Sequence, residues 1–272
     1  MADPPIQLLV SDIDGTLVRA DKTLSQATID AFRRLRAAGV LATLISARPP
    51  SGMIALAKAL AIEGPLGAFN GGTIFRRDGL IESAQHLSAD VAATSLSLLE
   101  HAGVDVWVFA HGLWYSRTID NPRVPHERLA AGIEPTLVAD FVGLNQIDKM
   151  VGVSEDFAAL ETLEGLAHAA VGDGATIARS QPYFLDITAP AGNKGDGIGE
   201  VARVAGIPLS KVAAIGDMPN DLPMFARAGL AIAMGQAPEK VQAAARFVTA
   251  SNDDDGVALA IDRYILRPET SC

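Results

Sequence analysis

Two aspartates separated by one residue stand directly after an apolar segment near the start of the chain. Leu8-Leu9-Val10-Ser11 is typical of a buried strand, and Asp12 and Asp14 follow it before a Gly-Thr turn. Side chains two positions apart in a strand point the same way, so the two carboxylates would repel each other unless a cation lay between them. One carboxylate could then attack phosphorus while the other moves a proton. Taken alone, the segment could equally be a turn without chemistry.

Two further segments offer hydrogen-bond donors and a cation. Ser46-Ala47-Arg48 follows a second apolar strand, and its hydroxyl and backbone N–H groups, at Ser46 and Ala47, could hold phosphate oxygens. A helix cap with a solvated arginine is the competing interpretation, and Arg48 could instead face a smaller lobe or solvent. Lys194, at the start of a later predicted helix, is a compact cation suited to phosphate. A lone exposed lysine would look the same in the sequence.

A fourth segment gathers oxygen-bearing side chains within one turn. Asp217, Asn220 and Asp221 come directly after the apolar strand predicted at Val212–Ile215. A helical turn would bring Asn220 and Asp221 back toward Asp217, and Mg²⁺ prefers a few carboxylates and waters. The alternative is that acidic residues simply favour a helix N-terminus. The set favours the metal interpretation.

The elements around these residues predict two lobes in an α/β protein. Strands and helices alternate up to about residue 83 and again from residue 189, which indicates a Rossmann-like parallel sheet core over 1–83 and 189–272. A helix followed by two strands occurs twice between 84 and 188, which predicts an inserted α+β cap domain with an antiparallel sheet. We also expect helices at 25–38, 51–62 and 256–265, a hairpin within 69–81 and a polar connection at 120–127.

All four segments follow strands or open helices of the predicted core lobe. Ligands of open α/β sheets bind outside the carboxyl ends of the strands. Each segment is a weak signal alone. Together they supply a nucleophile, a proton carrier, a phosphate cradle, a cation and a metal site, and a chance assembly of all five is improbable.

Composition excludes several classes of partner. The net charge of −10 argues against general binding to nucleic acid or to anionic membranes, and it requires local cations for any anionic substrate. No segment has the length and apolarity of a membrane span, and the first residues resemble no signal peptide. The only cysteine is Cys272, so we expect a cytoplasmic protein without an internal disulfide. The five histidines show no zinc-site spacing.

The complete motif set resembles the haloacid dehalogenase superfamily, over essentially the whole chain. The large insert resembles its Cof-type sugar phosphatase branch, as do Asn70-Gly71-Gly72 and Asp254-Asp255-Gly256. The resemblance implies a nucleophilic Asp12, an acid/base Asp14, and Ser46, Ala47, Lys194 and Asn220 around the phosphate. It also implies Mg²⁺ held by Asp12, the backbone carbonyl of Asp14 and Asp217. Supporting roles would fall to Asp221, Arg48, Asn70 and Gly71.

Some features depart from the family pattern or leave the function open. The second motif usually contains Thr-Gly-Arg where this chain has Ser46-Ala47-Arg48, and Gln236 stands where relatives often have Asn. We expect a phosphatase that acts on a small phosphorylated metabolite, such as a sugar phosphate, flavin mononucleotide or pyridoxal phosphate. We expect the protein to be a monomer or a small homo-oligomer. A phosphomutase and a catalytically silent binder remain alternatives. The aromatic residues Trp107, Trp114, Tyr115 and Tyr183 could contact a substrate ring, although such residues are more often core.

Overall fold

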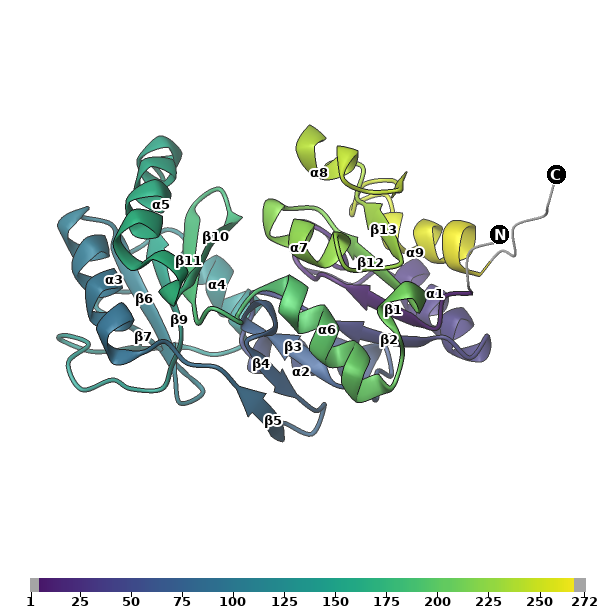
Figure 1. Ribbon diagram of the computed structural model, residues 1–272, viewed down its shortest axis with the longest axis horizontal. Helices are drawn as coiled ribbons and strands as arrows, with labels where there is room; N and C mark the ends of the chain where they lie inside the picture. The colour runs from purple at the N-terminus through teal and green to yellow at the C-terminus, as the bar shows by residue number, and fades with distance from the viewer. Residues whose placement is uncertain (1–4, 267–272) are drawn as a thin grey trace.

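A five-stranded parallel sheet forms the centre of the larger lobe (Figure 1). The computed structural model describes residues 5–266, so the expectations that rest on the first four residues and on Cys272 lie outside the described residues. The strand order is β14-β13-β12-β1-β2, with β1 in the middle. The bounds of these strands are β1 Leu8–Ser11, β2 Leu41–Leu44, β12 Val212–Gly216, β13 Leu230–Ala233 and β14 Phe247–Val248.

Helices cover both faces of this sheet, which explains why its central strands are continuously apolar. Leu9 packs with α1 (Gln26–Ala37) and α9 (Gly256–Ala260) on one face. Leu8 and Val10 pack with α6 (Lys194–Ala205) and α7 (Leu222–Phe225) on the other. In α1 the buried residues are Thr28, Ala31, Phe32 and Leu35, the spacing of one helix face. The helices of this lobe are α1 Gln26–Ala37, α2 Ser51–Ala59, α6 Lys194–Ala205, α7 Leu222–Phe225, α8 Glu239–Ala243 and α9 Gly256–Ala260, which continues as a π-helical turn over Ile261–Ile265.

The second lobe is built on a six-stranded sheet of order β10-β11-β9-β6-β7-β8. Its pairs are antiparallel except for β7 with β8. Helices α3 and α5 lie on one face of the sheet (Figure 1), and the opposite face turns toward the core lobe. The elements are α3 Ala89–His101, β6 Asp105–Ala110, β7 Leu113–Ser116, α4 Val124–Ala131, β8 Pro135–Leu137, β9 Ile147–Val153, α5 Phe157–Val171, β10 Thr176–Gln181 and β11 Phe184–Thr188.

The predicted α/β fold class, with its parallel core sheet and additional antiparallel sheet, is confirmed. The division of the chain at 83/84 and 188/189 is kept as a proposal. Within the described residues, no helix combines the length and apolarity needed to cross a membrane.

One helix was not expected from the sequence. The passage at 120–127, predicted as a polar connection, contains the start of α4. Pro125 stands in the first turn, Glu127 follows in the same turn, and Gly132 ends the helix in the left-handed conformation with φ 67°. These are ordinary start and stop signals. They were masked by the polar character of the flanking residues.

Both connections between the lobes run past Gly72. A small antiparallel sheet of β3 Leu66–Ala68, β4 Thr73–Phe75 and β5 Ile81–Ala84, which contains the predicted hairpin, leads into the second lobe. Directly after β5, the N–H of Gln85 donates to the carbonyl of Gly72 at 2.8 Å. The returning chain passes the same residue, because a Cβ on Gly72 would lie 3.2 Å from the Cα of Gly192. The inserted lobe is therefore joined to the core at one place.

Candidate active site

The segments singled out in the sequence converge at the carboxyl edge of the parallel sheet. Strand β1 pairs with β12 on one side and with β2 on the other, so Asp12, Asp217 and Ser46 emerge at neighbouring strand ends. Lys194 is the first residue of α6, whose N-terminus is capped by the Asn193 side chain. Residues from distant parts of the chain thus meet at one edge, as parallel strands require.

Lys194 joins two of the carboxylates. Its Nζ lies 2.5 Å from Asp12 Oδ1 and 2.5 Å from Asp221 Oδ1, and all three side chains are buried. Burial would lower the pKa of Lys194, but Asp12 and Asp221 outweigh that effect and raise it above its usual value. The ammonium is therefore permanently charged, and it is placed to favour the ionised form of Asp12.

Three buried carboxylates gather beside the Lys194 ammonium, which contacts two of them, Asp12 and Asp221. One oxygen from each of Asp12, Asp217 and Asp221 lies within 4.8 Å of the others. Burial raises the pKa of Asp12 to about 7 despite Lys194, and burial with the charges of Asp12 and Asp221 raises that of Asp217 well above its ordinary value. The negative charge in this cluster is thus incompletely neutralised. A divalent cation with a preference for oxygen ligands fits this donor set.

The Asp221 and Asp217 carboxylates have different hydrogen-bond partners, and Asp221 is held by backbone N–H groups. Its Oδ2 accepts hydrogen bonds from the N–H groups of Asp217 and Met218 at 2.8 and 2.9 Å. Asp217 in turn accepts a hydrogen bond from Thr16 Oγ1 at 2.8 Å. Asp221 therefore orients the turn after β12 and holds Lys194, while Asp217 faces the Asp-Gly-Thr turn.

Gly15 allows that turn to approach Asp217. Its φ of +80° is in the left-handed region, and a Cβ there would lie 2.3 Å from Asp217 Oδ2. Any side chain at this position would displace the Asp217 carboxylate. Gln236, a departure from the family pattern, donates from Nε2 to the Gly15 carbonyl at 2.5 Å and so supports the same turn.

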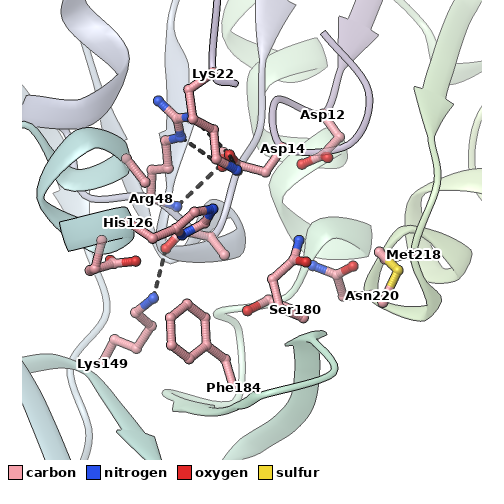
Figure 2. Close-up of a pocket in the computed structure, with 15 residues that line it drawn as sticks. Asp12, Asp14, Lys22, Arg48, His126, Lys149, Ser180, Phe184, Met218 and Asn220 are labelled. Atoms are coloured by element: carbon pink, nitrogen blue, oxygen red, sulfur yellow. Dashed lines mark hydrogen bonds and ion pairs between the residues drawn. The ribbon is translucent and has the colours of Figure 1, made fainter. Parts of the chain in front are cut away.

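Asp14 turns away from the carboxylate cluster and binds two cations (Figure 2). Arg48 reaches it in a bidentate manner, with Nε 2.6 Å from Oδ2 and Nη2 2.8 Å from Oδ1. Lys22 Nζ lies 2.5 Å from Oδ1. Burial would raise the pKa of Asp14, but Arg48 and Lys22 outweigh it and hold this pKa well below its usual range. Arg48, which could have faced solvent, is buried against the partly exposed Asp14.

The loop that carries Ser46, Ala47 and Arg48 is fixed by backbone hydrogen bonds. The carbonyl of Ser46 accepts from the N–H of Asn70 at 2.7 Å, and that of Arg48 accepts from Phe69 at 3.0 Å. The Asn70 side chain accepts a hydrogen bond from Asn220 Nδ2 at 3.2 Å. Asn220 is therefore linked to this loop through Asn70.

A pocket lies between the sheet edge and the inserted lobe. Figure 2 shows Asp12, Asp14 and Arg48 on its core side, with Lys149, Ser180 and Phe184 opposite them. Its lining residues are Asp12, Asp14, Lys22, Ser46, Ala47, Arg48, His126, Glu127, Ala130, Lys149, Ser180, Gln181, Phe184, Met218 and Asn220. The pocket therefore brings carboxylates and cationic side chains of the core together with residues of the inserted lobe.

Several pocket residues were missed by sequence reasoning. Lys22, His126, Glu127 and Lys149 line the pocket, but none belongs to a motif with chemical spacing. Burial is the largest effect on Glu127 and raises its pKa to about 7. A helix prediction for α4 would have placed His126 and Glu127 on a common element. Lys149 offered a weaker signal, because it and the adjacent Asp148 are charged residues in a strand that is otherwise apolar.

The aromatic residues considered as ring contacts lie elsewhere. Trp107 and Trp114 are fully buried and pack edge to face with ring centroids 4.9 Å apart. Tyr115 packs in the outer core of the inserted lobe, and Tyr183 lies beneath the Arg123 guanidinium. The aromatic residue that lines the pocket is Phe184.

Comparison with known proteins identifies the family. Residues 9–261 match the sequence profile of haloacid dehalogenase-like hydrolases, so the chain belongs to that family, as its motifs predicted. A Haemophilus influenzae protein named as a candidate phosphatase is 32% identical over 257 residues, covering 93% of this chain and 95% of that protein. A Bacillus subtilis 5-amino-6-(5-phospho-D-ribitylamino)uracil phosphatase, YcsE, is 26% identical over 265 residues, covering 97% and 98%.

Solved structures agree with this assignment. A haloacid dehalogenase-like hydrolase from Bacteroides thetaiotaomicron superposes with a TM-score of 0.82 at 28% identity, covering 95% of this chain and 99% of that one. A subclass IIB sugar phosphatase of the same superfamily superposes with a TM-score of 0.83 at 25% identity, covering 95% and 98%.

Proposed function

We propose that the protein is a Mg²⁺-dependent phosphatase that hydrolyses small phosphomonoesters through an aspartyl-phosphate on Asp12. The arrangement that carries this proposal is the Lys194 ammonium between Asp12 and Asp221, next to Asp217 at the carboxyl edge of the sheet. It pairs a buried carboxylate nucleophile with a fixed cation beside a pocket that residues of both lobes line. Membership of a hydrolase family and similarity to phosphatases support the same activity.

Each residue has a defined part in the reaction. A carboxylate oxygen of Asp12 attacks phosphorus as the bond to the leaving oxygen breaks, and Asp14 gives that oxygen a proton. Water then attacks the phosphoryl group and gives a proton to Asp14, and the bond between phosphorus and the Asp12 oxygen breaks, which releases phosphate and restores the Asp12 carboxylate. Ser46 and Lys194 contact the phosphoryl oxygens, while Asn220 is linked to their loop. Mg²⁺, held by Asp12, Asp217 and the backbone carbonyl of Asp14, would supply positive charge to the same oxygens.

The two steps require different states of Asp14. Paired with Arg48 and Lys22, the carboxyl group stays ionised, which suits a base. To act as an acid it must leave that pair and take up a proton. The pair therefore holds Asp14 in its resting position, and rotation about its side chain brings it to the leaving group.

Cationic side chains around the pocket offset the net negative charge of the chain, which would otherwise repel an anionic substrate. Lys22, Arg48, Lys149 and Lys194 lie in or beside the pocket, and they offset the carboxylates locally. Together with the similarity to a sugar phosphatase, this favours sugar phosphates or compact metabolites such as flavin mononucleotide and pyridoxal phosphate. A phosphate-release screen over such compounds would identify the substrate.

The activity is tested with a generic aryl phosphate. The wild-type protein is expected to release phosphate with Mg²⁺ and to stop when the metal is chelated. Asp12→Asn should abolish release while the circular dichroism spectrum is unchanged. Phosphate release by Asp12→Asn would contradict the assignment of Asp12 as the nucleophile. Failure of the wild type across the screen would indicate a binder, and isomer formation without free phosphate would indicate a mutase.

A further inference from the structure

A buried lysine of the inserted lobe contacts the loop that we assign to phosphate. Lys149 lies on β9, and its Nζ donates to the carbonyl oxygen of Ala47 at 3.0 Å (Figure 2). The side chain is 4% exposed, so little water competes for this hydrogen bond. It is a direct polar contact between the inserted lobe and the loop at 46–48, and it uses a full charge.

Lys149 is held in place from its own lobe. Asp186 on β11 lies 3.7 Å away, and the ring of Phe109 lies beneath the ammonium at 4.9 Å from its centroid. Neither carboxylate oxygen of Asp186 accepts a hydrogen bond from another described residue. A buried carboxylate without hydrogen bonds is costly, and the neighbouring ammonium offsets that cost. Asp186 therefore acts on Lys149 by position and charge.

The contact continues through one peptide group to Ser46. The carbonyl of Ala47 and the N–H of Arg48 belong to the same planar peptide and point in opposite directions. While the carbonyl accepts from Lys149, the N–H donates to Ser46 Oγ at 3.2 Å. A cation on the carbonyl polarises the peptide and strengthens its N–H as a donor. A hydroxyl oxygen that accepts this bond keeps its own proton for another acceptor.

We propose that Lys149 is a positioning residue that orients the Ser46 hydroxyl toward the phosphate through the Ala47–Arg48 peptide. Lys149 itself stays on the loop, and the substrate contact is made by Ser46. The proposal rests on the proposed function, since it takes this loop to be the phosphate cradle. It makes the cradle complete only when the inserted lobe is seated on the core, because the donor belongs to that lobe.

The test measures binding of inorganic phosphate in the presence of Mg²⁺, by calorimetry, and so removes the leaving group. Lys149→Met is expected to weaken phosphate binding about tenfold, the effect of losing one charged hydrogen bond. It should also raise KM by a similar factor for every ester tested. Lys149→Arg, which retains a donor, should recover most of the affinity. Lys58→Met, at an exposed helix position, is the matched control and should bind as the wild type does.

A double variant separates action through Ser46 from a direct effect of charge. If Lys149 works through the hydroxyl, adding Lys149→Met to Ser46→Ala should weaken phosphate binding by less than about twofold further. Losses that multiply in the double variant would overturn the proposal. So would unchanged phosphate affinity in Lys149→Met, or a loss that varies with the leaving group. If Lys149→Met fails to fold, the same cycle is run with Lys149→Gln.

Different results would refute the phosphatase activity and the role of Lys149. Wild-type protein that neither binds phosphate nor hydrolyses any ester would refute the phosphatase itself. Wild-type protein that does both, with a Lys149→Met variant that binds phosphate equally well, would refute the role of Lys149 alone.

Discussion

At the scale of single residues, the active site is a place of uncompensated charge. Asp12, Asp217 and Asp221 bring three carboxylates together, and Lys194 supplies one ammonium among them. Repulsion between buried like charges opposes folding, whereas the same charge density is what a metal ion and a phosphoryl group require. The residues that serve the reaction should therefore destabilise the metal-free protein.

Replacing the nucleophile should reveal this opposition. We expect Asp12→Asn to remove all turnover and to raise the unfolding free energy of the metal-free protein by about 1–2 kcal/mol, because one of the repelling charges is lost. Thermal unfolding in a chelator measures the change. Asp173→Asn, at an exposed turn, should leave both properties unchanged. A metal-free variant less stable than the wild type would contradict the argument.

Glu127 should make stability fall as pH rises toward neutrality. Burial raises its pKa to about 7, so between its ordinary pKa and that value the folded chain keeps a proton that the unfolded chain has lost. Stability present in acid is therefore lost through this window. Glu127→Gln should reduce the fall between about pH 5 and about pH 7 by about 2 kcal/mol. Urea unfolding at the two pH values, in a chelator, provides the measurement, and an equal fall in both proteins would refute it.

At the scale of elements, the site depends on how closely α6 approaches the short 3₁₀ turn Phe69–Gly71. A Cβ on Gly71 would lie 2.5 Å from the Cα of Gly197, and its φ is +94°. Lys194 is three residues before Gly197 on the same helix. Small residues on both sides therefore set the distance between Lys194 and the loop at 46–48.

A pair of glycine variants tests this approach. Gly71→Ala combines a strained φ with a backbone clash and should destabilise the protein by about 2–4 kcal/mol. Gly79→Ala has a similar φ of +91° with nothing within 4 Å of the new Cβ, so strain alone should lower stability by about 1 kcal/mol. Chemical denaturation compares them. Equal losses would show that the approach of α6 is not tight.

Local pattern was sufficient for the elements that carry the motifs. Strand β1 ends directly before Asp12, and α1, expected over 25–38, begins directly after Ser25, in agreement with the apolar spacing. Helix α4 was missed because its polar flanks hid its start and stop residues. The parallel sheet rule also brought Asp12, Asp217 and Lys194 together correctly. It could not place Lys22, whose position depends on a loop conformation. Nor could it place Lys149, whose position depends on how the inserted lobe packs against the core.

At the scale of the whole molecule, metal binding should couple the separate segments of the chain. Asp12 directly follows β1, and Asp217, 205 positions later, directly follows β12, so a cation between them links both parts of the core. A ligand that binds only the folded state stabilises it in proportion to its affinity. The gain should be visible without any substrate.

We therefore expect Mg²⁺ to raise the thermal midpoint of the wild type. At a concentration about one hundredfold above its dissociation constant, the stabilisation should be about 2.7 kcal/mol. Asp217→Asn should lose most of this gain, and Asp173→Asn should keep it. Scanning calorimetry with and without the metal tests both. An equal rise in Asp217→Asn would exclude Asp217 as a ligand.

The joint at Gly72 makes the inserted lobe a replaceable unit. Because the chain leaves and re-enters the core beside one residue, the segment between these two crossings can be exchanged, with one junction at each crossing, while the parallel sheet stays intact. Evolution can thus retain one chemistry and change the compounds it acts on. The contact between Lys149 and Ala47 sets a condition on such an exchange: an incoming lobe must bring its own donor to the same carbonyl.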